Sequence, residues 1–206
     1  MNKFFFYGTL RSIPILETVI GHKSDYLEFI PSFAPRSELR LVINESFPVI
    51  VFNDSYEGVH GTLVKGLNGE DINRILFFED VEFTPQQLDI EINGVIEQAS
   101  YFSQQGVRPS DDPWSFDEWQ QKYERLSVVT AELWMELYGK YSAEEADRYW
   151  NDVKQAALKK YQTIVNSMPE KAMTPKILEE ILQNKEKEVN ERKTKIPLEL
   201  SLIHIS

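Results

Sequence analysis

The chain opens with an aromatic segment that runs into a glycine. The stretch is Lys3-Phe4-Phe5-Phe6-Tyr7-Gly8-Thr9-Leu10-Arg11. Its consecutive aromatic residues predict a short buried strand over Lys3–Tyr7 that stops at Gly8. Because Gly8 has no Cβ atom, a ligand can approach the main chain closely, and consecutive N–H groups of such a turn can hold an anion or a developing oxyanion. The alternative is an ordinary tight turn after a buried edge strand.

The rest of the first hundred residues also reads as strand-rich. Asn93-Gly94 between two apolar–polar alternating segments is a strong hairpin signal. One short helix is expected over Asp71–Phe78, where large apolar residues gather. The further strands are expected over the following ranges: Glu38–Ile43, Val49–Phe52, Gly58–Val64, Leu88–Ile92 and Val95–Phe102.

Beyond residue 105 the pattern becomes helical. A polar linker over 106–113 precedes helical patterns over 115–137 and 142–164 and a third that starts at Thr174. The expected domains are therefore 1–105, a strand-rich domain, and 106–196, a helical extension. The apolar helix faces need burial, and self-association through the extension is one way to provide it. Residues 197–206 resemble translated sequencing-adaptor read-through and are expected to be a disordered or artefactual tail.

Composition excludes several classes of protein. The 206 residues include 22 Lys and Arg against 33 Asp and Glu, a net charge of −11, which argues against nucleic acid as a main partner. The apolar runs are too short for a membrane span, and Gly8, Arg11 and Pro14 interrupt any signal-peptide core. We therefore expect a cytoplasmic protein with no membrane partner.

The residues needed for several common chemistries are missing from the sequence. There is no cysteine and the three histidines, His22, His60 and His204, lie far apart, so no metal site is expected. No glycine-rich nucleotide motif and no G-x-S-x-G motif occurs, which argues against nucleotide cofactors and a serine nucleophile. No cofactor is expected.

A second candidate for catalysis is the segment Phe77-Phe78-Glu79-Asp80-Val81-Glu82-Phe83. Glu79 follows a run of large apolar residues at the end of the predicted helix. If these residues desolvate the carboxyl group, its pKa rises and it becomes an effective proton acceptor and donor near neutrality. The alternative is a helix that simply ends in water with its carboxylates solvated.

Taken together, the two segments resemble the gamma-glutamylcyclotransferase-like, or AIG2-like, family. Its members open with Y-G-[ST]-L and later carry L-D-x-x-E-G-x-x-Y. The matching segments occur in the family's order over residues 3–102, about half of the chain. They are Tyr7-Gly8-Thr9-Leu10, Phe47-Pro48-Val49-Ile50-Val51, Val59-His60-Gly61-Thr62-Leu63-Val64, Phe78-Glu79-Asp80-Val81-Glu82-Phe83 and Ala99-Ser100-Tyr101-Phe102.

The carboxylate segment departs from the family pattern around a retained glutamate. Leu76 stands where the family has Asp, Asp80 where it has Gly and Phe83 where it has Tyr. The aromatic residue four positions after Glu79 favours Glu79 over Glu82 as the family glutamate.

The resemblance implies an α+β fold: a small mixed β-barrel with flanking helices, followed here by the helical C-terminal extension. It also implies a cofactor-independent enzyme that cyclises a gamma-glutamyl amine or amino acid to 5-oxoproline and releases the amine. Glu79 would be the general acid and base. The substrate-binding candidates are Tyr7, Gly8, Thr9, Leu10, Arg11 and Tyr101.

Two rival interpretations remain open. In the first, the barrel is retained as a non-catalytic module used for small-molecule binding or regulation, an interpretation motivated by the substitutions around Glu79. Alternatively, the chain is an enzyme of this fold that acts on a different gamma-glutamyl derivative, such as an acylated amine.

Overall fold

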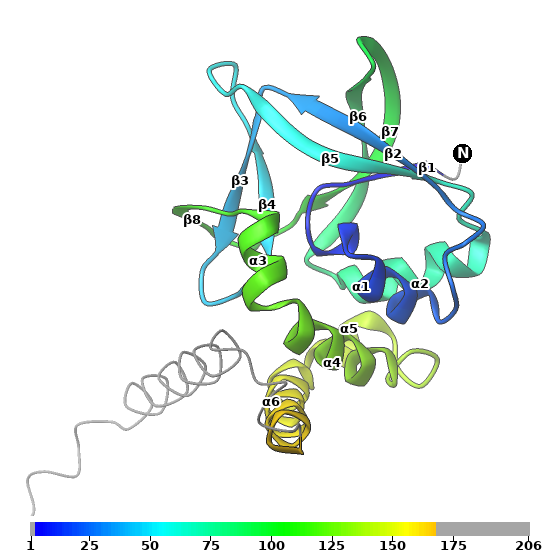
Figure 1. Ribbon diagram of the computed structural model, residues 1–206, viewed down its shortest axis with the longest axis vertical. Coiled ribbons are helices and arrows are strands. Elements are labelled where there is room, and N and C mark those ends of the chain that lie inside the picture. The colour runs from blue at the N-terminus through cyan, green and yellow to red at the C-terminus, as the bar shows by residue number, and fades with distance from the viewer. Residues whose placement is uncertain (1–2, 168–206) are drawn as a thin grey trace, which may run out of the picture. The chain divides into compact units, whose positions relative to one another are not determined.

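The computed structural model describes residues 3–167 and contains a closed β-barrel. Five strands close it in the order β1-β5-β2-β6-β7 (Figure 1). Strand β1 pairs antiparallel with β5 and parallel with β7, so the barrel is mixed. The barrel strands have the following bounds: β1 Lys3–Phe6, β2 Glu28–Pro35, β5 Gly58–Lys65, β6 Phe83–Ile92 and β7 Val95–Gln104.

A second sheet has three strands, in the order β4-β3-β8. Strand β3 (Ser37–Val42) pairs antiparallel with β4 (Pro48–Phe52) on one side and with β8 (Pro109–Pro113) on the other. Pro48 is the first residue of β4 and Phe47 precedes it, and both lie near the N-terminal loop. A Cβ atom on Gly8 would lie 3.2 Å from Cγ of Pro48.

Helices α1 (Ile13–Ile20) and α2 (Gly69–Glu79) lie side by side, and α4 (Glu124–Met135) packs against both (Figure 1). A short 3-10 turn, η1 (Thr9–Arg11), links β1 to α1. The remaining helices are α3 (Phe116–Lys122), α5 (Ala143–Asp147) and α6 (Trp150–Ser167). None of the helices in residues 3–167 is long and apolar enough to cross a membrane.

The chain divides after Tyr161 into two compact units, of which the second is described only over 162–167. In the first unit, one apolar cluster fills the barrel interior around Phe5, Leu63 and Ile90. A larger cluster lies between the barrel and the helices and joins Phe6 and Leu16 to Trp119 and Trp134. This larger cluster contains residues from both sides of position 105. The domain limits at 105 and 196 stay predictions.

The expected α+β fold with a small mixed barrel and flanking helices is confirmed, and six of its strands are found near their predicted bounds. Strand β2 was not expected, because Pro31 and Pro35 argue against a strand interior. It pairs with β5 along its whole length but with β6 only at Phe33. Most of one edge of β2 is therefore unpaired, and a residue without an N–H group is tolerated there.

Helix α1 was not predicted either, although the sequence contains residues typical of a helix N-terminus and C-terminus. The Ser12 hydroxyl accepts the Ile15 N–H at 3.3 Å, Pro14 stands in the first turn, and Gly21 ends the helix with φ +84°. The pattern over 115–137 is two helices that meet at Tyr123, and the pattern over 142–164 is likewise split, into α5 and α6. The helix from Thr174 and the tail over 197–206 lie outside the described residues.

Gly61 is required by close packing in the barrel. A Cβ atom there would lie 2.4 Å from Cε2 of Phe5 and 2.7 Å from the Phe6 carbonyl oxygen. Phe5 is fully buried and Phe6 O is backbone, so neither can move freely.

We therefore predict that Gly61→Ala destabilises the fold by about 1–3 kcal/mol, the usual range for overpacking. Urea unfolding measures this loss. The matched control is Gly69→Ala in the first turn of α2, where a Cβ atom would meet no atom within 4 Å. Equal stability of the two variants would contradict the packing argument.

A second structural feature is the His22–Asp71 pair that ties the segment after α1 to the start of α2. His22 Nε2 lies 2.8 Å from Oδ1 of the fully buried Asp71, and Nδ1 lies 3.0 Å from the Lys23 carbonyl oxygen. Tyr26 donates its hydroxyl to the other Asp71 oxygen at 2.6 Å. Because both His22 partners are acceptors, the ring satisfies both only as an imidazolium. The bonds to Lys23 and Asp71 accordingly raise the pKa of His22.

A raised histidine pKa stabilises the fold below the unfolded-state pKa, and this contribution is lost as the pH rises through the folded-state pKa. We predict that His22→Gln lowers Tm more at about pH 5.5 than at about pH 9. Asp71 stays ionised at both values because its pKa is lowered by the Tyr26, Asn68 and His22 bonds, despite burial. In an Asp71→Asn background the same substitution should show a smaller pH dependence, because only the bond to the Lys23 carbonyl then raises the pKa of His22. If His22→Gln lowers Tm equally at the two pH values in the native background, the raised pKa of His22 is contradicted.

Candidate active site

A cavity of about 120 Å³ lies where the N-terminal loop meets the end of α2. Both segments singled out in the sequence line it. Tyr7, Gly8, Thr9 and Leu10 come from the loop after β1, and Glu79 is the last residue of α2. The volume is well above the roughly 10–15 Å³ that one water molecule requires, so the hollow has room for part of a small molecule.

Helix α2 places Glu79 at the cavity. A capped N-terminus and a buried apolar face hold the helix in position. Asn68 caps the helix by accepting the N–H groups of Glu70 and Asp71, and Asp71 bonds back to the Asn68 N–H. Ile75 and Phe77 are buried and anchor the last turns. The helix ends directly after Glu79, so its carboxyl group is presented at the helix terminus.

The environment of Glu79 is poor in water. Burial raises the pKa of Glu79 to about 8. The residue retains partial exposure because it borders the cavity. Within residues 3–167 no hydrogen bond to its carboxyl group is found, so nothing in this part of the chain favours the charged form. A carboxyl group of this kind can hold or release a proton near neutral pH.

Tyr7 is fixed next to this acid. Its hydroxyl donates to the Phe102 carbonyl oxygen at 2.6 Å. Burial raises the pKa of Tyr7 well above its ordinary value, and the nearby Glu79 and Tyr101 raise it further. The hydroxyl therefore stays protonated, and its bond to Phe102 ties the end of β1 to β7.

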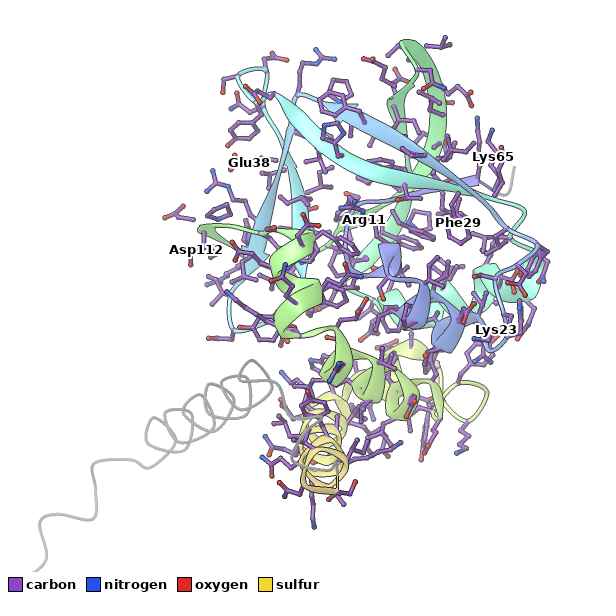
Figure 2. The ribbon with its side chains drawn as sticks, in the orientation of Figure 1. Arg11, Lys23, Phe29, Glu38, Lys65 and Asp112 are labelled. Carbon is purple, nitrogen blue, oxygen red and sulfur yellow. The ribbon has the colours of Figure 1, made fainter. Side chains whose placement is uncertain are left out.

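The other two candidates, Arg11 and Tyr101, do not line the cavity. The Arg11 guanidinium, labelled in Figure 2, lies 4.2 Å from the centre of the Phe116 ring, and burial lowers its pKa. Tyr101 belongs to the barrel-interior cluster beside Tyr7 and packs edge-on against Phe52.

Part of the cavity wall comes from the helical region, which the sequence offered no reason to connect with the site. Trp134 of α4, Asp147 of α5 and Trp150 of α6 all line the hollow. Trp134 and Trp150 meet edge to face at 5.4 Å. Tryptophans on helices commonly serve only in packing, and only the fold shows that these two also face the cavity.

Further carboxyl groups border the same hollow. Asp80 and Glu82 follow Glu79, and Asp147 lies against Asp80. Burial, and contact with Asp147, raise the pKa of Asp80 to about 6. Within residues 3–167 no group of three histidine or acidic side chains is arranged to hold a metal ion.

No family model matches the chain. AIG2-like protein C of Arabidopsis thaliana is 24% identical over 132 residues, which cover 62% of this chain and 73% of that protein.

Among solved structures, an Arabidopsis thaliana protein aligns with a TM-score of 0.48 at 17% identity, over 67% of this chain and 93% of its own. A gamma-glutamyl cyclotransferase aligns with a TM-score of 0.45 at 11% identity, over 71% and 86%. Both scores are below 0.5, so the description of the fold rests on the strand pairing of this chain. The curated relative confirms the resemblance predicted by the motifs of residues 3–102, and the chain is similar to the AIG2-like, gamma-glutamylcyclotransferase-like proteins.

Proposed function

We propose that the protein is a cofactor-independent enzyme of the gamma-glutamylcyclotransferase type. One observation carries the proposal: the desolvated carboxyl group of Glu79 shares a small cavity with the main chain of Tyr7–Leu10. The substrate is a gamma-glutamyl amide, and the products are 5-oxoproline and the released amine.

The reaction is an intramolecular transfer that needs no second reactant. The α-nitrogen of the glutamyl group attacks its own γ-carbonyl carbon, a new C–N bond closes the five-membered lactam, and the original amide C–N bond breaks. Two protons leave the attacking ammonium nitrogen, and the departing amine gains two. Holding the chain folded supplies much of the rate, because the reacting atoms are already connected.

Glu79 is assigned the transfer of these protons. Its raised pKa brings it close to that of an amine, and approach of the substrate ammonium group favours the carboxylate form. The carboxylate takes a proton from the attacking nitrogen and then gives it to the leaving nitrogen. The N–H groups of Gly8, Thr9 and Leu10 are assigned to the substrate carboxylate or the tetrahedral oxyanion.

The first test is Glu79→Gln, which removes the titrating group and keeps the side-chain volume. We expect 5-oxoproline release from a panel of gamma-glutamyl amides to fall by about 10² or more. Glu136→Gln, on an exposed acid at the end of α4 outside the cavity lining, is the matched control. Full turnover by Glu79→Gln with an unchanged circular dichroism spectrum would remove Glu79 from the mechanism. Ligand stabilisation of the native protein without product from any amide would support the non-catalytic module instead.

The second test uses stability, which does not depend on turnover. An acid whose folded-state pKa is raised destabilises the fold increasingly as the pH rises from its unfolded value toward its folded value. For Glu79 this window runs from about 4.5 to about 8. The Tm of Glu79→Gln should therefore rise relative to the native protein as the pH increases across this window. A constant difference in Tm would show that the carboxyl group is solvated.

A further inference from the structure

Helix α4 contacts both of the segments that meet at the cavity. Near its start, the Glu124 carboxylate accepts the hydroxyl of Ser12, which follows the η1 turn, at 2.7 Å. Near its end, the indole N–H of Trp134 donates to the Phe77 carbonyl oxygen, with the two heavy atoms 3.4 Å apart. One helix therefore connects the chain after β1 with the last turn of α2, which carries Glu79.

The last turn of α2 leaves room for a donor from outside the helix. In a continuing helix the Phe77 carbonyl oxygen would accept the N–H of Val81, four residues further on. Here the Val81 N–H binds Oδ1 of Asp80 at 2.7 Å instead, and the Phe77 oxygen accepts the Asp80 N–H at 3.2 Å. A carbonyl oxygen has a second lone pair, and Trp134 supplies the donor for it.

The residue after Glu79 turns the chain out of α2 in an unusual conformation. Asp80 has φ +58° and ψ −169°, a region that is occupied almost only by glycine. Such a conformation persists where neighbouring contacts hold it. The bond from Trp134 to Phe77 acts on the same turn, so it helps to fix the direction in which the Glu79 side chain leaves the helix.

Trp134 is itself firmly held. It is 2% exposed, and its ring packs against the Phe77 ring with the centroids 5.6 Å apart. It also meets Trp150 edge to face and lines the cavity together with Glu79. The indole therefore binds the end of α2 and also fills space beside the acid.

From these contacts we infer that Trp134 is a positioning residue for Glu79: through the Phe77 carbonyl it fixes the last turn of α2 and so holds the carboxyl group in the cavity that the Tyr7–Leu10 loop borders. The action is indirect, because the indole binds the backbone two residues before the acid that it orients. The consequence for catalysis rests on the proposed function. The consequence for the environment of Glu79 does not.

The first test uses stability and does not depend on turnover. The difference in Tm between the native protein and Glu79→Gln is measured from about pH 4.5 to about pH 8, and again in a Trp134→Phe background. Phenylalanine keeps an aromatic ring but has no N–H donor. If the end of α2 loosens, water reaches the carboxyl group and its pKa falls. The change of the Tm difference across this window should then shrink to about half or less.

Other titratable groups face Glu79 from the elements around it. Tyr7 does so from the loop after β1, Asp80 and Glu82 from the segment after α2, and Asp147 from α5. No Lys, Arg or His lines the cavity among the residues that the structure describes. Because these groups are present in both members of each pair of variants, their own titration cancels to first order in the Tm difference.

The second test uses turnover of a gamma-glutamyl amide. A misplaced acid should lower kcat of Trp134→Phe by about tenfold or more, while KM changes by less than about threefold. The acidic limb of the pH profile of kcat/KM should also move to lower pH, because the carboxyl group of Glu79 is then less desolvated. A purely structural role of Trp134 would lower Tm without moving that limb.

Trp119→Phe is the matched control. Trp119 is also 2% exposed, it lies outside the cavity lining, and its Nε1 has no hydrogen-bond partner within residues 3–167. The control therefore removes the same atoms from the core without breaking a bond to α2. It should lower Tm at every pH but should preserve both the Glu79 contribution and the position of the acidic limb.

A second change at position 134 separates the lost bond from the lost volume. Incorporation of 3-benzothienyl-alanine keeps the size of the indole and replaces its N–H group by sulfur, which cannot donate. It should reproduce the effects of Trp134→Phe on Glu79, and it decides the question if Trp134→Phe fails to fold.

The outcomes distinguish this inference from the proposed function. An undiminished Glu79 contribution after both changes at position 134, or the same reduction in Trp119→Phe, would overturn the inference. An active enzyme whose kcat and acidic limb stay unchanged in both would do so too. Absence of 5-oxoproline from the native protein would overturn the proposed function, and the Tm comparison would then decide the positioning role of Trp134 by itself.

Discussion

Closure of the barrel by β1 is the constraint on which the rest of the structure depends. This four-residue strand pairs with β5 on one side and meets β7 at Phe4 and Ser100 on the other. The Tyr7 hydroxyl continues the connection through the Phe102 carbonyl. Because β1 is held on both sides, the residues that follow it leave the barrel in one direction, toward the end of α2. The cavity exists because this short loop and Glu79 are brought together there.

Electrostatics divides the cavity into two parts. Burial raises the pKa of Glu79 to about 8 and that of Asp80 to about 6, whereas Glu82 and Asp147 are exposed to solvent. Glu79 is therefore the acid of this hollow that holds a proton near neutral pH. The same separation weakens repulsion among the acids, since the most deeply buried of them carries no charge.

Local patterns in the sequence predicted six of the strands and the two segments that meet at the cavity, and the family resemblance predicted the barrel. The hairpin at Asn93-Gly94 is an example: both residues have positive φ, as the turn requires. Strand β2 could not be predicted in this way, because its prolines are tolerated only on the edge that is left mostly unpaired, and its pairing with β5 joins segments that are distant in the sequence. Trp134 and Asp147 were missed for a similar reason. Their helical spacing indicates packing, and nothing local indicates that the helices lie beside the loop after β1.

The short helix α5 ends in Asp147, only a few residues before Trp150 begins α6. One compact surface segment therefore supplies both an acid and an aromatic ring to the cavity wall. Substitutions confined to that segment leave the strands and their register untouched. The chemistry of the cavity wall can therefore diverge through that segment while the strand pairing that closes the barrel stays intact.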